Sequence, residues 1–339
     1  MKKRILAMVL ILPLFLFSGC GAREKKRFQA SYLSLFDTVT TILGYEEDQE
    51  TFEKTAQRIH DRMEEYDHLY DIYHEYPGLV NLCTLNRHPG EEMAVDARIL
   101  DLLALSQQAD AFSGHRTDAM FGAVLRLWHE AREEGINNPQ EAVLPEMEAL
   151  RAAREHTGFG LLEIDSERNT VRLTDPEASL DLGALAKGYA VQKVCDMLPE
   201  GYLLSVGGNV AATGPKPDGS AWTVGIQDPF ASEEAYLLKL SLSRGAVVTS
   251  GDYQRYYIVD GKRYHHIIDP DTLFPADRWC AVTVIAADSG IADALSTTLF
   301  LMDREKGQKL LDQFDAEALW IQKDGTQLYS DGFEKYLKP

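Results

Sequence analysis

Apolar residues recur at helical spacing along the first half of the chain. Phe52, Ala56, Ile59 and Met63 lie three or four positions apart, and they predict an amphipathic helix that ends before Pro77-Gly78. The same spacing predicts four further helices, over residues 95–112, 120–128, 188–198 and 289–302. Helices therefore dominate the early part of the chain.

The later half is rich in β-branched and alternating segments, which predict strands. The predicted strands, including one early strand, cover residues 32–43, 202–206, 222–227, 246–249, 255–259, 282–286, 319–322 and 326–329. Asp260-Gly261 and Asp324-Gly325 predict two-residue hairpins, because a type I′ turn needs positive φ at both positions. Consecutive hairpins favour an α+β fold, with a largely antiparallel or mixed sheet packed with helices, over a doubly wound one.

The chain has 339 residues, of which 45% are hydrophobic, and a formal charge of −19. This composition supports one large domain or two small ones. Such an acidic chain would be repelled by nucleic acid and by anionic membrane surfaces. An anionic ligand would therefore need local cations or a divalent metal ion.

The N-terminus has the form of an export signal. Lys2, Lys3 and Arg4 precede an apolar run that is too short for a membrane span, and Ser18-Gly19 precede Cys20 as in a bacterial lipobox. We expect residues 1–19 to be a lipoprotein signal peptide, 20–30 a lipidated tether, and 31–339 a single domain anchored at the outer face of the cell membrane. The weaker alternative is an ordinary signal peptide with a chance cysteine.

Three further cysteines lie far apart along the chain. Cys83, Cys195 and Cys280 are odd in number and form no Cys-x-x-Cys pair. This pattern argues against a disulfide framework and against a zinc site.

Residues 179–191 form the stretch with the clearest chemical character. Asp181 and Lys187 bracket Gly183 and Ala184, and a helical pattern follows. Small residues allow close approach of the backbone, a helix start offers free N–H groups, and Lys187 adds positive charge. The stretch suits a phosphate group, although a helix start with a solvated Asp and Lys fits it equally well.

Two other features could carry chemistry. Asp293 and Thr297 are four apart in a helical segment, so they share one face, and both offer the hard oxygen ligands that Mg²⁺ takes. His266 follows the 255–259 hairpin and could act as a general base, because histidine titrates near neutral pH. A helix-surface pair and a histidine bonded to backbone are the respective structural alternatives.

Five blocks together resemble the ApbE family. They are Asp-Leu-Gly-Ala-Leu-Ala-Lys-Gly-Tyr-Ala (181–190), Ser-Val-Gly-Gly-Asn-Val (205–210), Thr-Ser-Gly-Asp-Tyr (249–253), His-Ile-Ile-Asp-Pro (266–270) and Ala-Asp-Ala-Leu-Ser-Thr (292–297). The family consists of flavin transferases, often exported lipoproteins, that move FMN from FAD to protein. The resemblance extends from about Tyr32 to Tyr336.

The resemblance implies a reaction and a set of site residues. A Thr or Ser hydroxyl of a target protein attacks the FMN-side phosphorus of FAD, and AMP leaves. His266 matches the base, and Mg²⁺ is held by Asp293, Thr297 and the Ala184 carbonyl. The positions that match FAD contacts are Phe36, Tyr73, Arg116, Thr117, Asp118, Asp181, Lys187, Ser250 and Ile268. The implied target is a subunit of a membrane redox complex, of the sodium-pumping NADH:quinone reductase or RNF type, or an extracellular flavoprotein.

The chain departs from the family pattern at three positions. Thr117 stands where an aromatic residue is usual, Phe36 where Met is frequent, and Leu273 where a Gly often follows. Two other functions remain open: an FAD pyrophosphatase that gives FMN and AMP, and a non-catalytic flavin-binding lipoprotein. The second is disfavoured because storage needs neither a base nor a metal.

Overall fold

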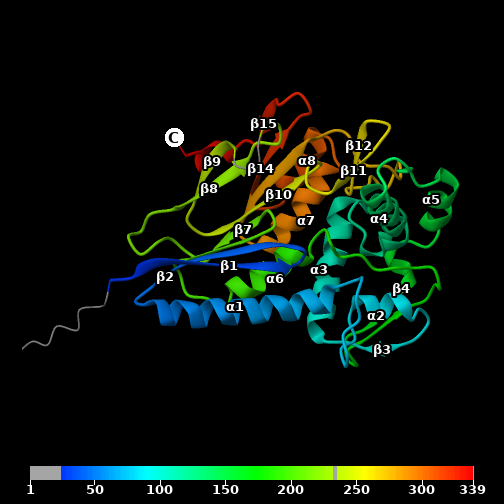
Figure 1. Ribbon diagram of the computed structural model, residues 1–339, viewed down its shortest axis with the longest axis horizontal. Coiled ribbons are helices and arrows are strands. Elements are labelled where there is room, and N and C mark those ends of the chain that lie inside the picture. The colour runs from blue at the N-terminus through cyan, green and yellow to red at the C-terminus, as the bar shows by residue number, and fades with distance from the viewer. Residues whose placement is uncertain (1–23, 232–234, 339) are drawn as a thin grey trace, which may run out of the picture.

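An eight-stranded sheet forms the centre of the molecule in the computed structural model, which describes residues 24–231 and 235–338 (Figure 1). Its strands run in the order β1 (Lys26–Leu35), β2 (Thr38–Glu46), β6 (Tyr202–Val206), β7 (Asn209–Ala212), β10 (Gly245–Gly251), β13 (Ala281–Ala286), β14 (Ala316–Ile321) and β15 (Gln327–Tyr329). Every neighbouring pair is antiparallel. The α+β prediction is confirmed.

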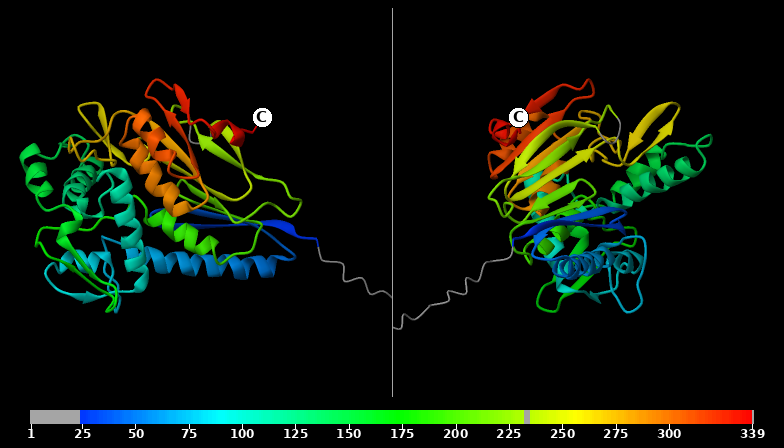
Figure 2. Two further views of the ribbon diagram at one scale, coloured as in Figure 1. Left: turned by 180° about the vertical axis from the view of Figure 1, so that it is seen from behind. Right: turned by 60° about the vertical axis from the view of Figure 1, so that its left-hand side comes forward.

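Both faces of this sheet are covered, because successive side chains of a strand point to opposite faces. In β13, Val282 and Val284 join the core on the helical face, whereas Ala281 and Ile285 join the core on the other face. The helices on the first face are α1 (Gln49–Tyr70), α6 (Ala186–Cys195) and α7 (Ser289–Phe300), seen from behind in Figure 2. The other face is covered by β8 (Trp222–Gln227), β9 (Tyr236–Leu242) and the 3₁₀ turn η3 (Phe333–Tyr336).

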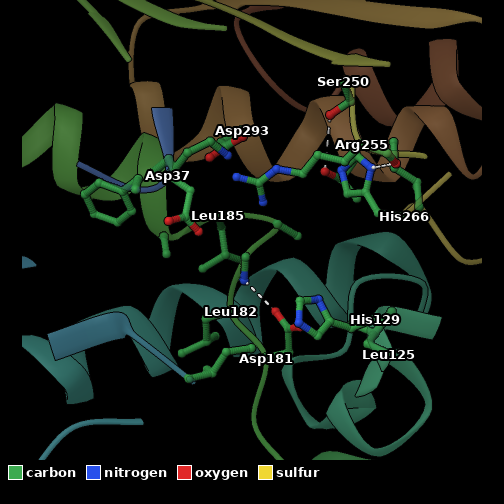
Figure 3. A pocket seen from close by; sticks show the side chains of 18 of the residues that line it. Asp37, Leu125, His129, Asp181, Leu182, Leu185, Ser250, Arg255, His266 and Asp293 are labelled. Atoms are coloured by element: carbon green, nitrogen blue, oxygen red, sulfur yellow. Dashed lines mark hydrogen bonds between the residues drawn. The ribbon is translucent and has the colours of Figure 1, made fainter. Parts of the chain in front are cut away.

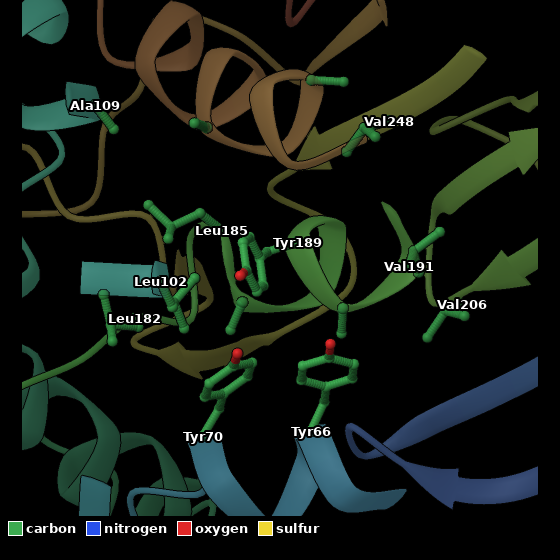
Figure 4. Close-up of a cluster of buried hydrophobic side chains, with 14 of the residues drawn as sticks. Tyr66, Tyr70, Leu102, Ala109, Leu182, Leu185, Tyr189, Val191, Val206 and Val248 are labelled. Carbon is green, nitrogen blue, oxygen red and sulfur yellow. The ribbon is translucent and has the colours of Figure 1, made fainter. Parts of the chain in front are cut away.

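A group of tyrosines joins α1 to α6 (Figure 4). Tyr66 and Tyr70 of α1 each make an edge-on ring contact with Tyr189, with centroids 6.3 and 6.2 Å apart. Aromatic pairs of this geometry add about 0.5–1.5 kcal/mol beyond the area that they bury. Leu182 and Leu185 are buried beside them. This packing holds the 181–187 turn against the long helix.

A second apolar cluster lies beside the sheet. It joins α4 (Gly122–Asn137), α5 (Met147–Arg154) and the hairpin of β11 (Tyr256–Val259) and β12 (Lys262–His265), and Trp128 is buried at its centre. The remaining elements are α2 (Leu82–Arg87), β3 (Met93–Ala94), α3 (Ala97–Ser113), η1 (Ala119–Phe121), η2 (Phe159–Leu161), β4 (Leu162–Asp165), β5 (Thr170–Leu173) and α8 (Arg304–Leu311).

The predicted elements agree with the structure except at the start of the chain. The predicted strand 32–43 is two strands, because Phe36 and Asp37 form a turn with φ of 51° and 54°. Phe36 is not a usual type I′ turn former, and Asp37 stands where the second turn position usually has glycine, so the sequence carried no clear turn signal there. β1 also begins at Lys26, inside the predicted tether. The predicted signal peptide and Cys20 lie outside the described residues.

Several helices and strands were not predicted: α2, α5, α8, β3, β7 and β9. Cys83, Cys195 and Cys280 are free thiols, as the cysteine pattern predicted. Among the described residues, no helix combines the length and apolarity needed to cross a bilayer.

Candidate active site

A cavity of about 820 Å³ lies between the helical face of the sheet and the cluster around α4. All of the site residues predicted from the sequence line it: Phe36, Tyr73, Arg116, Thr117, Asp118, Asp181, Ala184, Lys187, Ser250, His266, Ile268, Asp293 and Thr297. Figure 3 shows Asp293, Arg255 and His266 along one wall, with Asp181 and His129 opposite. The fold thus brings together residues from segments more than 200 positions apart.

An irregular start of α6 creates one corner of the cavity. In a regular helix the Gly188 N–H would donate to the carbonyl oxygen of Ala184, four residues earlier. Here it donates to Asp293 Oδ2 at 2.8 Å. The Ala184 carbonyl is therefore released from the helical pattern, and the Asp293 carboxylate, which is only 4% exposed, keeps its other oxygen for a ligand.

Thr297 adds a third oxygen to this corner. Its neighbours Ser296 and Thr298 donate their hydroxyls to helix carbonyls, at 2.9 and 2.8 Å. The Thr297 hydroxyl instead lies 3.4 Å from Ser250 Oγ and lines the cavity. One carboxylate, one hydroxyl and one carbonyl are hard donors that fit Mg²⁺ retaining several waters. No group of three or more His, Cys, Asp or Glu in the described ranges is placed to hold a metal, so a metal ion at this corner would have to use these mixed donors.

His266 is fixed through the main chain of Arg255. Its N–H donates to the Arg255 carbonyl at 3.1 Å, and its Nδ1 lies 3.3 Å from the same oxygen. A carbonyl only accepts, so Nδ1 carries the proton of the neutral ring and Nε2 keeps a lone pair. Burial and nearby positive charges, above all Arg255, lower the pKa of His266 to about 3. The expected near-neutral titration is therefore wrong for the ligand-free cavity.

Three cations that line the cavity have no acidic partner. Arg132, Lys187 and Arg255 make no ion pair within 4 Å among the residues that the structure describes, although the chain is strongly acidic. Sequence reasoning found Lys187 but missed Arg132 and Arg255. Arg255 lies two residues after the Thr249–Tyr253 block, and this closeness could have marked it as a candidate site residue. Their lack of partners becomes visible only in three dimensions.

Aromatic rings form the opposite wall. The Tyr73 ring stacks on His129 with centroids 4.7 Å apart, and Arg132 Nη2 donates to His129 Nδ1 at 2.7 Å. Burial raises the pKa of Tyr73 to about 12. Burial also raises the pKa of Asp181, although its carboxylate accepts the Gly183 N–H at 2.9 Å. The wall offers flat surfaces with little net charge.

The side chains of the 116–118 turn are used within the protein. Arg116 pairs with Asp271 at 2.8 Å, and Asp118 accepts the Met120 N–H at 2.8 Å. Burial raises the pKa of Asp118 to about 6. The Thr117 hydroxyl is buried and donates to the Ala109 carbonyl at 3.3 Å. Thr117, where the family usually has an aromatic residue, therefore ties the turn to α3.

Two other segments complete the lining. Phe36 is in the left-handed turn between β1 and β2. Position 207 has no room for a side chain, since a Cβ on Gly207 would lie 2.7 Å from Thr38 Oγ1. Ile268 is buried in the same apolar cluster as Leu273. Leu273 has a φ of 63°, so the turn keeps the backbone shape that glycine favours.

The chain is similar to known proteins over most of its length. A model of the ApbE family matches residues 36–320. An FAD:protein FMN transferase of Klebsiella pneumoniae (strain 342) is 32% identical over 279 residues, which cover 80% of this chain and 83% of that protein. Two solved structures have a similar fold. The ApbE protein of Thermotoga maritima MSB8 has a TM-score of 0.82 at 28% identity, with 93% of this chain and 100% of that chain covered. The flavin transferase ApbE from Vibrio cholerae has a TM-score of 0.77 at 27% identity, with 92% of this chain and 100% of that chain covered.

Proposed function

The chain belongs to the ApbE family, and we propose that, as an FAD:protein FMN transferase, it transfers FMN to a Thr or Ser hydroxyl of its target with the help of Mg²⁺. The family resemblance read from the five sequence blocks is confirmed. One observation carries the chemical part of the proposal. A single cavity combines three hard oxygen donors, three cations without an acidic partner among the described residues, and a neutral histidine.

The cavity suits FAD in size and in charge. Its volume of about 820 Å³ is within the usual range of about 300–1,000 Å³ for ligand sites. Lys187 and Arg255 can neutralise a pyrophosphate, and the Tyr73 ring can stack on a planar ring system. When bound by Asp293, Thr297 and the Ala184 carbonyl, Mg²⁺ would neutralise phosphate charge and so favour departure of AMP.

His266 is the residue that we assign as the base. The acceptor hydroxyl oxygen attacks the FMN-side phosphorus while its proton passes to the free lone pair on His266 Nε2. The bond from that phosphorus to the bridging oxygen breaks, and AMP leaves with that oxygen and its electron pair. Nδ1–H stays bonded to the Arg255 carbonyl, which keeps the ring oriented throughout.

The place of the reaction follows from the N-terminus. We propose that acyl chains on Cys20 hold the protein at the outer face of the membrane, and that the target is a redox-complex subunit or an exported flavoprotein. Cys20 lies outside the described residues, so the sequence alone supports this step. Replacing Cys20 by Ser should release the chain from the membrane fraction, and a wild-type chain without acyl mass on Cys20 would contradict the anchor.

A mass measurement tests the transfer. The full chain is incubated with FAD, Mg²⁺ and a candidate target, and the target is then weighed by mass spectrometry. Transfer adds one FMN, minus water, to a Thr or Ser of the target and releases one AMP. Release of both FMN and AMP with an unmodified target would instead show that water is the acceptor.

A further inference from the structure

Arg132, Lys187 and Arg255, the cavity cations that form no ion pair within the described residues, repel one another. Burial lowers the pKa of Arg132, and the Arg255 guanidinium lowers it further, so the two charges lie within interaction range. Both also act on His266, as does Lys187. Asp181 also lines the cavity and interacts with both arginines, but none of the three cations pairs with an acid within 4 Å among the described residues, so an anion bound between them would relieve their repulsion. This arrangement is typical of a site built for phosphate.

Arg255 differs from the other two cations because it is bound to His266 directly. Its carbonyl accepts the His266 N–H at 3.1 Å and lies 3.3 Å from Nδ1. In Figure 3 its side chain lies between those of His266 and Asp293. One residue therefore orients the histidine through its main chain and places a positive charge near the metal corner.

The loop that carries Arg255 is held firmly. Asp252, three residues earlier, is buried and forms an ion pair with Lys323. Its N–H donates to the Cys280 carbonyl at 3.0 Å, and the Cys280 thiol lies 3.4 Å from its carboxylate. These contacts fix the loop that leads to Arg255 against β13 and the residues that follow β14.

We propose that Arg255 is a further catalytic residue: its guanidinium binds the pyrophosphate of FAD, and this contact allows His266 to accept a proton only when FAD is present. The proposal rests on the transfer of FMN proposed above. It assigns to Arg255 both an electrostatic contact with the substrate and control over the base.

The charges around His266 explain how this coupling works. His266 faces Arg255 of the β10–β11 loop, His265 of β12, Arg132 of α4 and Lys187 of α6, and each disfavours the imidazolium form. An anionic pyrophosphate between these cations cancels their field, so the imidazole becomes a stronger base. The acceptor proton can then move to Nε2 as the phosphorus–oxygen bond to AMP breaks. Without FAD the imidazole is a weak base, so transfer of a proton to it is unfavourable.

The test replaces the charge and keeps the length of the side chain. Arg255→Met is compared with Arg255→Lys and with Arg263→Met, which removes an exposed arginine of the same hairpin that lies outside the cavity. For each full-length chain, NMR titration follows His266, with its signals assigned from a His266→Asn sample, with and without FAD and in the absence of Mg²⁺. The FAD dissociation constant and the single-turnover transfer rate are measured on the same samples.

We expect Arg255→Met to raise the pKa of His266 in the ligand-free chain. Binding of FAD should raise the pKa of His266 more in the wild type than in this variant. FAD affinity should fall at least tenfold and the transfer rate at least a hundredfold, typical of a lost electrostatic donor. Added guanidinium should restore part of the rate. Arg255→Lys should keep the low pKa, and Arg263→Met should match the wild type.

An unchanged His266 titration in Arg255→Met, or unchanged FAD affinity, would overturn the proposal. An equal loss of rate in Arg263→Met would do the same, because it would show an effect of the hairpin fold. The titration and affinity measurements need no acceptor protein. Failure of the wild type to transfer FMN would therefore contradict the proposed function. The titration and affinity measurements would still decide whether Arg255 binds FAD and controls His266.

Discussion

The Gly188 N–H donates to Asp293 Oδ2 at 2.8 Å, so the start of α6 is bonded to the side of α7. This bond places the carboxylate at the cavity and releases the Ala184 carbonyl from its helical donor. It requires a residue without a side chain, because a Cβ on Gly188 would lie 2.3 Å from the Ser289 carbonyl oxygen and 2.4 Å from Asp293 Cβ. A glycine in a helix is unfavourable by itself, so its presence here reflects the close approach.

Replacing Gly188 by Ala should therefore be destabilising. Forcing an extra carbon into packed surroundings costs about 1–3 kcal/mol, and relief requires α6 and α7 to separate. We expect a lower melting temperature and a higher Mg²⁺ requirement for transfer. Gly160→Ala is the matched control, because no atom lies within 4 Å of a Cβ built there. Equal melting temperatures of the two variants would show that the helices tolerate the contact.

Removal of the carboxylate tests the metal assignment. Asp293→Ala should abolish Mg²⁺-dependent release of AMP and leave the chain folded, since loss of a ligand commonly removes several kcal/mol of transition-state stabilisation. Circular dichroism checks the fold, and AMP release is measured over a range of Mg²⁺ concentrations. Wild-type release at saturating Mg²⁺ would contradict the assignment.

His266→Asn should separate binding from chemistry. Asn keeps a hydrogen-bonding side chain but cannot accept a proton, and a positioned base is typically worth about 10²–10⁴ in rate. In the proposed site the phosphate contacts are made by Lys187, Arg255 and the Mg²⁺ ligands, so FAD affinity should change little. The dissociation constant and the single-turnover rate are measured on the same folded sample. A histidine with a purely structural role would instead lower stability and affinity together, with no selective loss of rate.

The low pKa of His266 also predicts how stability depends on pH. In the unfolded chain a histidine titrates near pH 6.5, whereas the folded ring, buried beside Arg255, has a pKa of about 3. Between these values the unfolded state binds more protons, so stability falls as the pH decreases from about 6.5 toward 3. We expect His266→Asn to lose less stability than the wild type between pH 7 and pH 5. Parallel melting curves for the two chains would argue against a histidine held neutral by burial.

The sequence predicted that the candidate oxygen donors and the candidate base share one cavity, because their motifs have fixed spacing. Asp293 and Thr297 are one helical turn apart, and His266 follows a recognisable hairpin. It did not predict Arg132 and Arg255, because arginines usually pair with acids at the surface and only the fold shows that these two have none. It also missed the Phe36-Asp37 turn, in which Phe36 adopts a φ value that its bulky side chain disfavours. That turn lines the cavity, where such strain is commonly tolerated.

Leu273 poses a related question, since it replaces a frequent glycine and still has a φ of 63°. The left-handed conformation costs a leucine about 1–2 kcal/mol. Against this, its side chain is buried in the cluster around Trp128, and full burial of a leucine contributes about 1.5–3 kcal/mol. The Leu273 carbonyl also accepts the Trp128 Nε1–H at 2.9 Å. Any residue at position 273 has this main-chain carbonyl, so the hydrogen bond does not explain the choice of leucine. Burial therefore outweighs strain.

Two substitutions separate these effects. Leu273→Gly removes both the strain and the buried side chain, and should destabilise the chain by about 1 kcal/mol, the difference between the lost burial and the relieved strain. Leu273→Ala also removes most of the side chain but keeps the strain of a Cβ at positive φ, so it should be less stable than Leu273→Gly by about 1 kcal/mol. This order is the reverse of that at an ordinary helical or extended position, where alanine is favoured. Urea unfolding of the wild type and the two variants measures this order of stability. An alanine variant more stable than the glycine variant would show that the turn relaxes to negative φ.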